Sequence, residues 1–584
     1  MKIEIDVEGE KIEAETGRSL LDAMRAAGVR LTSPCGGKGT CGKCLVKIDP
    51  EKSPAGPTTA ELALLESEDI AQGYRLACQT YPEKGVSVEI PEESREVTLE
   101  LLLKHATIKE IEEPALVART GELGPSERPS GFPSNRGTVW YDGGVVVAVT
   151  PEGESRIGIA LDIGSTTMVA YVFDIIGQRI VSAEAMTNPQ RQYGEDIMTR
   201  IDMAMKGADK KKLLERVLRN GVSELVKNAA SRSGYAPGEV LRLSFVGNTA
   251  MHHFFLGLDV TRLGRVPFQP ERKDSIEVMG ADIGLKGLEN ARVSAPPLIA
   301  GYVGADLVGV LLASDLGGMK APTAAIDIGT NAEIALSIGG KVVSCSAAAG
   351  PAFEGGNISH GMRATEGAIS KVWSENGAIK FETIGKAETV GLCGSGLIDF
   401  VSEGLRLGLI DSTGTFVKEN CGDRLMGKHG NARFLLHSDG RREVSVSQAD
   451  IRQLQLGKAA IHSGLEIMME KMKLKSIDKL LLAGAFGANM SIRNGRFIGM
   501  FPEIPLNMIV PIGNAAGTGA IQLLTDMRAR GRVEEIAKKT AHVELSSEKD
   551  FQKRFIAALD FPHQDASKYP ESSKSVKIMV KRGK

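Results

Sequence analysis

The sequence predicts an α/β protein with a small α+β module at its N-terminus. The first 28 residues carry an alternating apolar pattern, a turn at Gly9 and the stretch SLLDAMRAAG, which together predict a β-hairpin followed by a helix. Beyond residue 156, apolar strand patterns recur around two copies of the tripeptide Asp-Ile-Gly, and a capped helix is predicted over 447–472. Strands and helices are therefore expected in both parts of the chain.

Four cysteines give the N-terminal module its chemistry. Cys35, Cys41, Cys44 and Cys78 are spaced C-x5-C-x2-C-x33-C, and the first three share the glycine-rich loop PCGGKGTCGKC. The glycines let this loop curl tightly and turn its amides toward sulfur. Four thiolates in this arrangement suit a [2Fe-2S] cluster, whose plant-type spacing differs here by one residue in the first gap.

Structural zinc and disulfides are the alternatives for these thiols. Structural zinc usually takes two close cysteine pairs, whereas one pair is close here. Disulfides suit secreted chains, but Met1 leads directly into the strand pattern KIEIDV with no signal peptide. We therefore favour the cluster and expect a cytoplasmic protein.

Residues 1–92 resemble a β-grasp ferredoxin. The resemblance rests on the hairpin, the helix and the cysteine loop, and the longer first gap is similar to the adrenodoxin-like branch. It implies a one-electron carrier. Because no dinucleotide-binding fingerprint of a reductase half is found, we expect an external low-potential electron donor.

Composition argues against two classes of partner. Of 584 residues, 42% are hydrophobic, and 71 basic against 73 acidic side chains give a formal net charge of −2. This balance leaves no broad electrostatic footprint for nucleic acid or for an anionic membrane. No apolar run reaches the roughly 18 residues of a membrane-spanning helix. We expect neither a nucleic-acid nor a membrane partner.

Residues 93–155 are predicted to be a flexible linker with a small hairpin. The stretch from Gly121 to Gly137 is rich in Gly, Pro and Ser, which predicts a mobile tether. The following TVWYDGGVVVAV predicts two short strands joined at Asp142–Gly143. The alternative is a loop packed on the next domain.

An internal repeat begins at residue 157. IGIALDIGSTTMVAYVFD (157–174) and TAAIDIGTNAEIALSIG (323–339) share a strand, a turn and a strand, with Asp162 and Asp327 at matching positions. The glycine of each turn lets the backbone approach a phosphate, whose oxygens can accept from the neighbouring hydroxyls. The two aspartates would hold Mg²⁺ through water, because this ion dehydrates reluctantly.

A third element completes a family resemblance. IDKLLLAGAFGANM (477–490) predicts a buried strand and then a small-residue turn against which a nucleoside can lie. DIGS, DIGT and GAFG, in this order, resemble the phosphate 1, phosphate 2 and adenosine motifs of the actin, sugar kinase and Hsp70-like ATPase superfamily. The resemblance implies that 156–584 is an ATPase domain of two ribonuclease H-like lobes, 156–320 and 321–530, plus a C-terminal extension. Segments 245–255 and 513–520 resemble the connections where such lobes hinge.

The fusion of the two halves resembles the reductive activators of corrinoid proteins. EGGNISHGMRATEGAI (354–369), GLCGSGLIDF (391–400) and FIAALDFPH (555–563) extend the resemblance over nearly the whole chain. It implies ATP-dependent one-electron reduction of Co(II) to Co(I) in a corrinoid protein of a methyltransferase system. Family members commonly have a middle domain between ferredoxin and ATPase, for which residues 93–155 leave room only for a remnant.

Motifs and resemblance together assign the candidate site residues. We expect Asp162 and Asp327 to organise Mg²⁺ and the attacking water, with Glu333 and Glu354 as further water or Mg²⁺ contacts. The phosphates are expected to lie among Gly164, Ser165, Thr166, Thr167, Gly329, Thr330 and Asn331. The nucleoside is expected against Gly484, Ala485, Phe486 and Gly487.

Alternative functions stay open. A redox-regulated small-molecule kinase would need a substrate pocket, and the sequence identifies none. A redox-responsive ATP-binding scaffold would bind a partner without changing it. Activators of 2-hydroxyacyl dehydratases share the ATPase and the uphill electron but carry no ferredoxin domain. The oligomeric state is open, a homodimer included.

Overall fold

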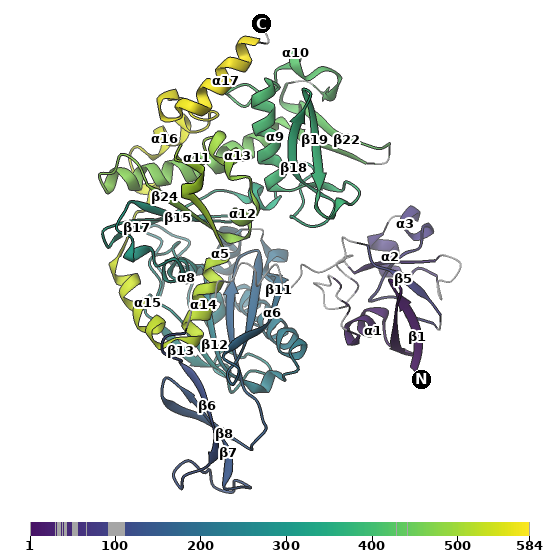
Figure 1. Ribbon diagram of the computed structural model, residues 1–584, viewed down its shortest axis with the longest axis vertical. Helices are drawn as coiled ribbons and strands as arrows, with labels where there is room; N and C mark the ends of the chain where they lie inside the picture. Colours follow the sequence, from purple (N-terminus) through teal and green to yellow (C-terminus); the bar gives the residue numbers. More distant parts are fainter. Residues whose placement is uncertain are drawn as a thin grey trace. The chain divides into compact units, whose positions relative to one another are not determined.

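The computed structural model divides into two compact units, one led by residues 1–98 and a larger one that holds most of residues 99–584 (Figure 1). The residues that it describes are 2–27, 29, 31, 37, 39, 44–49, 56–65, 67–83, 85–91, 111–194, 196–427, 429–440 and 442–582. Cys35 and Cys41 lie outside these ranges, as does the segment 92–110.

The N-terminal unit is a five-stranded sheet with short helices. The strand order is β2-β1-β5-β3-β4, in which β1 runs antiparallel to β2 and parallel to β5. The elements are β1 Lys2–Val7, β2 Glu10–Glu15, α1 Leu20–Ala26, β3 Leu45–Ile48, α2 Thr59–Leu64, α3 Ser67–Ala71, β4 Tyr74–Leu76 and β5 Ser87–Glu89. Alternate residues of β1, namely Ile3, Ile5 and Val7, are buried, as the period of a strand with one covered face requires. The predicted hairpin and helix are confirmed.

Residues 111–150 form a three-stranded sheet that packs on the rest of the larger unit. Its strands are β6 Leu116–Glu122, β7 Arg136–Asp142 and β8 Val145–Thr150, so the predicted hairpin turn after Asp142 is confirmed. Leu116 and Trp140 are fully buried, and the backbone N–H of Ala115 donates to the carbonyl of Thr525 across 2.8 Å. This part of the predicted linker is therefore folded, because buried apolar residues flank the Gly/Pro/Ser-rich stretch.

The first lobe is a six-stranded sheet of order β11-β10-β9-β12-β14-β13. Its strands are β9 Ile157–Ile163, β10 Thr167–Asp174, β11 Arg179–Thr187, β12 Val240–Gly247, β13 Ile276–Met279 and β14 Arg292–Ala295. Its helices are α5 Ile197–Met205, α6 Ala208–Arg232, α7 Thr249–Leu256 and α8 Ala305–Ser314. The strand β9 runs antiparallel to β10 and parallel to β12.

The second lobe repeats this plan. Its order is β25-β24-β15-β16-β17-β26, and β15 is antiparallel to β16 and parallel to β24, as β9 is to β10 and β12. Its strands are β15 Thr323–Ile328, β16 Ala332–Ile338, β17 Lys341–Ala347, β24 Lys479–Ala483, β25 Ile509–Gly513 and β26 Thr540–His542. Its helices are α11 Gln448–Lys471, α12 Gly484–Asn489, α13 Ile492–Phe497, α14 Ala515–Thr525 and α15 Met527–Lys539. The shared topology gives the sequence repeat its structural meaning.

Smaller elements lie between β17 and β24 and at the C-terminal end. Two three-stranded sheets have the orders β19-β18-β20 and β21-β22-β23. The elements are β18 Ala368–Glu375, β19 Ala378–Thr383, β20 Gly391–Leu392, α9 Gly394–Leu407, α10 Lys418–Cys421, β21 Leu425–Met426, β22 Arg433–Ser438, β23 Glu443–Ser447, α16 Phe551–Ala557 and α17 Pro570–Arg582. The predicted capping box of α11 is confirmed, since Ser447 and Asp450 exchange hydrogen bonds. No helix in the described ranges is both long and apolar enough to cross a membrane.

Helices α8 and α14 cross at two glycines. A Cβ on Gly519 would lie 2.3 Å from the carbonyl oxygen of Gly309, so only hydrogen fits there. The helix α14 also packs on β9 and β12 of the first lobe, although its neighbour β25 belongs to the second. Segment 513–520 thus connects the lobes as expected, whereas 245–255 lies in the core of the first lobe, where Phe254 and Phe255 are fully buried. The helix that meets α14 is α8.

Candidate nucleotide and cluster sites

The start of α14 holds the first aspartate in place. Asn514 caps this helix by accepting from the N–H of Gly517 with its side-chain oxygen. Its Nδ2 donates to Oδ2 of Asp162 across 3.0 Å and to the hydroxyl of Tyr171 across 3.2 Å. One amide therefore satisfies a helix terminus and orients a carboxylate at the end of β9.

Glu354 joins the two phosphate-type turns. Its Oε2 accepts from Thr166 across 3.1 Å and from Thr330 across 2.9 Å, so the turns of the two lobes meet at one oxygen. Glu354 ends a short helix, Pro351–Glu354, and its Oε1 faces Gly329. The structure thus brings together the hydroxyls that the repeat singled out.

The turns themselves have the tight geometry that was expected of them. The N–H of Gly164 donates to the carbonyl of Thr167 across 3.1 Å, and the N–H of Gly329 donates to that of Asn331 across 3.0 Å. A Cβ on Gly164 would lie 2.5 Å from the carbonyl oxygen of Thr167. Ser165 is half-buried and Thr167 exposed beside it. The backbone at both turns can therefore approach a ligand closely.

The third motif lies against the second aspartate. Gly484 has a φ of +83°, and a Cβ there would lie 2.6 Å from Oδ1 of Asp327. The expected small-residue turn is instead the first turn of α12, entered through this left-handed glycine. The ring of Phe486 packs 5.2 Å from that of Phe353. GAFG is thus beside the site, and Gly484 makes room for the carboxylate.

A further carboxylate at the site, that of Asp306, was not predicted from the sequence. It stands in the first turn of α8, and its negative charge raises the pKa of Asp327 and of Glu333. The segment ADLVGVLL carries no repeat and resembles an ordinary buried helix. The one available signal was a single acidic residue at the head of an otherwise apolar run.

Burial and mutual repulsion perturb these acids. Burial raises the pKa of Asp162 to about 6, and the hydrogen bond from Asn514 opposes this rise. Burial and the charge of Asp162 raise the pKa of Asp306 and of Asp327 to about 7. Burial also raises the pKa of Glu333 well above its ordinary value. A cation placed among these groups would relieve the repulsion that keeps them protonated.

The chemistry of the acids fits Mg²⁺ carried by a nucleotide. Among the described residues, no three His, Cys, Asp or Glu side chains form a metal site by themselves. Mg²⁺ keeps several waters and is usually held by one or two carboxylates plus substrate phosphates. Asp162 and Asp327 are the carboxylates that would take this role.

The described half of the cysteine quartet places two thiols side by side. Cys44 and Cys78 are buried, and the thiol of Cys44 hydrogen-bonds to that of Cys78. This bond lowers the pKa of Cys78 to about 6, with further contributions from Gln79 and from the backbone of Gly39, while burial opposes them. Donors directed at a thiolate are what a bound iron–sulfur cluster requires. Neither sulfur is joined in a disulfide.

Three family models match the chain. A 2Fe-2S iron-sulfur cluster binding domain matches residues 3–83. The RACo middle region matches 157–318, and the C-terminal domain of RACo, the ASKHA domain, matches 321–573. The middle-region model covers the residues that were expected to form the first ATPase lobe.

Two relatives match more than two thirds of the chain. Corrinoid activation enzyme RamQ of Eubacterium limosum is 30% identical over 583 residues, which cover 94% of this chain and 97% of that protein. The chain belongs to the RACo family of corrinoid activation enzymes. Another relative of this RACo-family chain, the Co(II) methylated amine-specific corrinoid protein reductase of Methanosarcina barkeri, is 24% identical over 439 residues, 69% of this chain and 77% of that protein.

A solved structure matches the whole RACo-family chain. The reductive activator for corrinoid, iron-sulfur protein superposes with a TM-score of 0.72 and 29% sequence identity, over 97% of this chain and 100% of that one. Because that structure is covered throughout, this chain has lost no domain relative to it. The shortened middle region expected from the sequence is therefore not a difference from this relative.

Proposed function

We propose that the protein reductively activates a corrinoid protein, transferring one electron to convert Co(II) to Co(I) at the expense of ATP. The observation that carries the proposal is the bridge at Glu354, which joins two phosphate-type turns in a chain that also holds the paired thiols Cys44 and Cys78. The names of the relatives supply the acceptor, since they activate or reduce corrinoid proteins.

The cysteine quartet would hold the group that carries the electron. Cys44 and Cys78, with Cys35 and Cys41, would ligate a [2Fe-2S] cluster, which when bound supplies a one-electron carrier. The N–H of Gly39 and the amide of Gln79 act on the Cys78 sulfur and favour its thiolate. An external low-potential donor would reduce this group, because no dinucleotide fingerprint is present in the sequence.

The need for ATP follows from redox energetics. Each unfavourable step of about 59 mV in a one-electron transfer lowers the equilibrium yield tenfold. ATP can overcome such a gap only through two protein states that bind the corrinoid partner differently. Glu354 bridges the two lobes, and α8 and α14 cross at Gly309 and Gly519. Nucleotide binding could therefore shift the equilibrium between two arrangements of the lobes.

The carboxylates of Asp162 and Asp327 would serve ATP hydrolysis in two ways, by accepting a proton and by holding Mg²⁺. Asp327, which lies beside Gly484 at the site, can accept a proton from the attacking water when its carboxylate is ionised. Asp162 and Asp327 would hold Mg²⁺, which when bound supplies charge neutralisation for the phosphates. Thr166 and Thr330 would turn their hydroxyls from Glu354 to phosphate oxygens.

The decisive experiment mixes reduced protein with a Co(II) corrinoid protein, with and without Mg-ATP, and follows cobalt absorption. ATP-dependent formation of Co(I) is expected for the wild type. Asp162→Ala should lose it while the visible spectrum of the cluster is unchanged. Wild-type protein that gives no ATP-dependent Co(I) would refute the proposal, whereas phosphoryl transfer to a small molecule would favour a kinase.

A further inference from the structure

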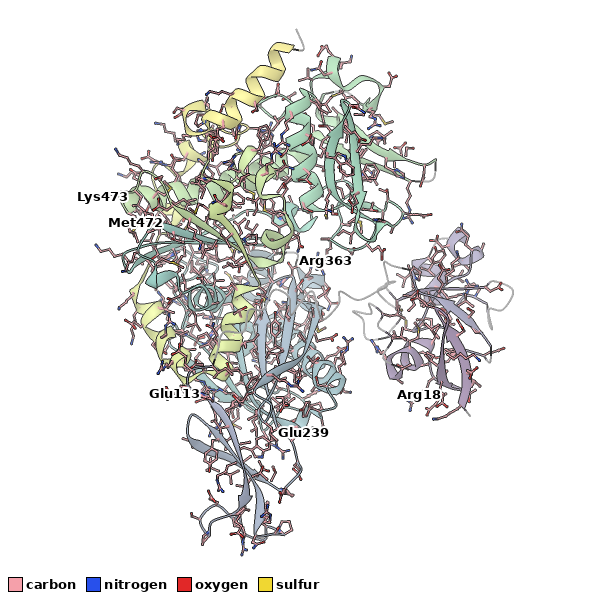
Figure 2. The ribbon with its side chains drawn as sticks, viewed as in Figure 1. Arg18, Glu113, Glu239, Arg363, Met472 and Lys473 are labelled. Atoms are coloured by element: carbon pink, nitrogen blue, oxygen red, sulfur yellow. The ribbon has the colours of Figure 1, made fainter. Side chains whose placement is uncertain are left out.

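One loop of the second lobe carries an acidic residue and a positively charged residue close to the nucleotide site. This loop, the 354–363 loop, begins at Glu354 and ends at Arg363, which is labelled in Figure 2. Glu354 accepts from the threonines of both turns, as described above. Arg363 is nine residues away in sequence, and it contacts the strand of the first lobe that pairs with the residue after the first turn.

Arg363 contacts the strand that flanks the first turn. Its Nη1 donates to Oγ1 of Thr187 across 3.0 Å. Thr187 is the last residue of β11 and pairs with Thr167. The next residue, Asn188, donates its backbone N–H to the carbonyl of Thr166 and its side-chain Nδ2 to that of Gly164. The guanidinium therefore contacts a segment that is hydrogen-bonded to the turn in which phosphate is expected.

The backbone of the 354–363 loop is held firmly. Met362 donates to the carbonyl of Leu392, and Leu392 donates back to that of His360, across 3.0 and 2.8 Å. A Cβ on Gly355 would lie 1.9 Å from the carbonyl oxygen of Met362, so the two ends of the loop are in close contact. A guanidinium presented from such a backbone needs little reorganisation to meet a ligand.

The negative charge of the nucleotide site explains why a positive side chain is needed at position 363. The site gathers five acids, namely Asp162, Asp306, Asp327, Glu333 and Glu354, and a polyphosphate adds further negative charge. The planar fork of arginine matches the oxygens of a phosphate and keeps its charge at any physiological pH. Arg363 comes from the second lobe and Thr187 from the first, so its contact also depends on how the lobes close.

We propose that Arg363 contacts the phosphate chain of bound ATP and stabilises the charge that develops as the terminal phosphoryl group passes to water. In this step the bond from the terminal phosphorus to the bridging oxygen breaks, and a bond to the oxygen of water forms. The water proton passes to a site carboxylate, and ADP retains the electron pair of the broken bond. The inference rests on the proposed ATPase function.

The test compares Arg363→Ala and Arg363→Lys with wild type in steady-state ATP hydrolysis. Loss of one preorganised donor to a developing charge lowers turnover by about 100-fold, which is expected for Arg363→Ala, with partial recovery in Arg363→Lys. Added guanidinium at millimolar concentration should restore part of the Arg363→Ala turnover. Arg528→Ala is the matched control, because Arg528 is an exposed arginine that pairs with Glu112, and neither residue belongs to either turn.

Binding assays separate this inference from the function on which it rests. Arg363→Ala should weaken Mg-ATP binding while adenosine binding and the melting temperature stay at wild-type values. If the wild type neither binds nor hydrolyses Mg-ATP, the proposed function itself fails. If the wild type hydrolyses ATP and Arg363→Ala stays within about threefold of it, or loses adenosine and ATP alike with a lower melting temperature, Arg363 has no phosphate role.

Discussion

Asn514 donates its side-chain amide to the carboxylate of Asp162 across 3.0 Å, although 352 residues separate them in the chain. The contact runs from the N-cap of α14, beside the second lobe, to the end of β9 in the first. The protonation of an acid in one lobe is thereby tied to the position of a helix that connects both.

Replacing Asn514 should move the pH dependence of ATP hydrolysis. The hydrogen bond from Asn514 favours the ionised form of Asp162, so in Asn514→Ala the pKa of Asp162 rises above about 6. The acidic limb of the pH–activity profile should shift to higher pH, and loss of the cap should cost about 1 kcal/mol of stability. The profile is measured by steady-state kinetics between pH 5 and 9.

A matched variant isolates the electrostatic part of this effect. Asn514→Ser keeps a helix-capping oxygen and removes the amide donor, so it should share the pH shift with a smaller loss of stability. An unchanged acidic limb in both variants would contradict the role given to Asn514.

Neutralising Asp327 should stabilise the nucleotide-free protein at alkaline pH. Burial raises the pKa of this group from 3.8 to about 7, so the folded state binds its proton more tightly than the unfolded state. Its contribution is fully present below about pH 4 and is lost as pH rises through 7. Asp327→Asn should therefore raise the free energy of unfolding at pH 8 by about 1–2 kcal/mol, after allowance for partial exposure, and by clearly less at pH 5.

Calorimetric melting at both pH values checks this prediction. Asp423→Asn, a change at an exposed aspartate, serves as the control and should have no effect at either pH. Equal effects of Asp327→Asn at pH 5 and pH 8 would show that the substitution acts on packing rather than on ionisation.

Cys78→Ser should remove the visible absorption of the cluster while ATP hydrolysis persists. The adjacent thiols of Cys44 and Cys78 supply half of the expected ligand set, and serine is a poor substitute for a thiolate ligand. Iron content and absorption are measured after reconstitution. Cys421→Ser is the control, because the buried Cys421 thiol donates to the carbonyl of Leu409 within the larger unit. Full absorption in Cys78→Ser would argue against the assignment.

Removing Asp142 should strongly destabilise the larger unit. Burial alone would raise the pKa of Asp142, but Arg242 and Arg530 hold it below its ordinary value. Asp142→Ala leaves two largely buried guanidinium groups without this partner, which costs about 3–5 kcal/mol. Chemical denaturation measures the loss.

An exposed ion pair nearby provides the comparison for Asp142. Glu152 pairs with Arg136 on the same small sheet, and both side chains are about half exposed. Glu152→Ala should cost far less stability than Asp142→Ala, because solvent screens an exposed ion pair. Similar losses in the two variants would show that the ion pairs of Asp142 with Arg242 and Arg530 do not anchor residues 111–150 to the rest of the larger unit.

The fold could be predicted from short sequence patterns. The alternation at Ile3, Ile5 and Val7 indicated a hairpin, and the repeated Asp-Ile-Gly turns indicated two lobes, because each pattern reflects contacts within a few residues. The mobility expected around Gly121–Gly137 stays a prediction, but composition did not show that Trp140 and Asp142 of the flanking strand find partners far along the chain.

By itself the sequence determined the chemical inventory of this protein: four cysteines in cluster spacing, two turn aspartates and the glycines that let a ligand approach. Only the tertiary structure decided how they are combined. Asp306 joins the acids, Glu354 bridges Thr166 and Thr330, and Asn514 holds Asp162, all through contacts between segments distant in sequence. Such contacts depend on how helices and sheets pack, and no short-range pattern of residues encodes that packing.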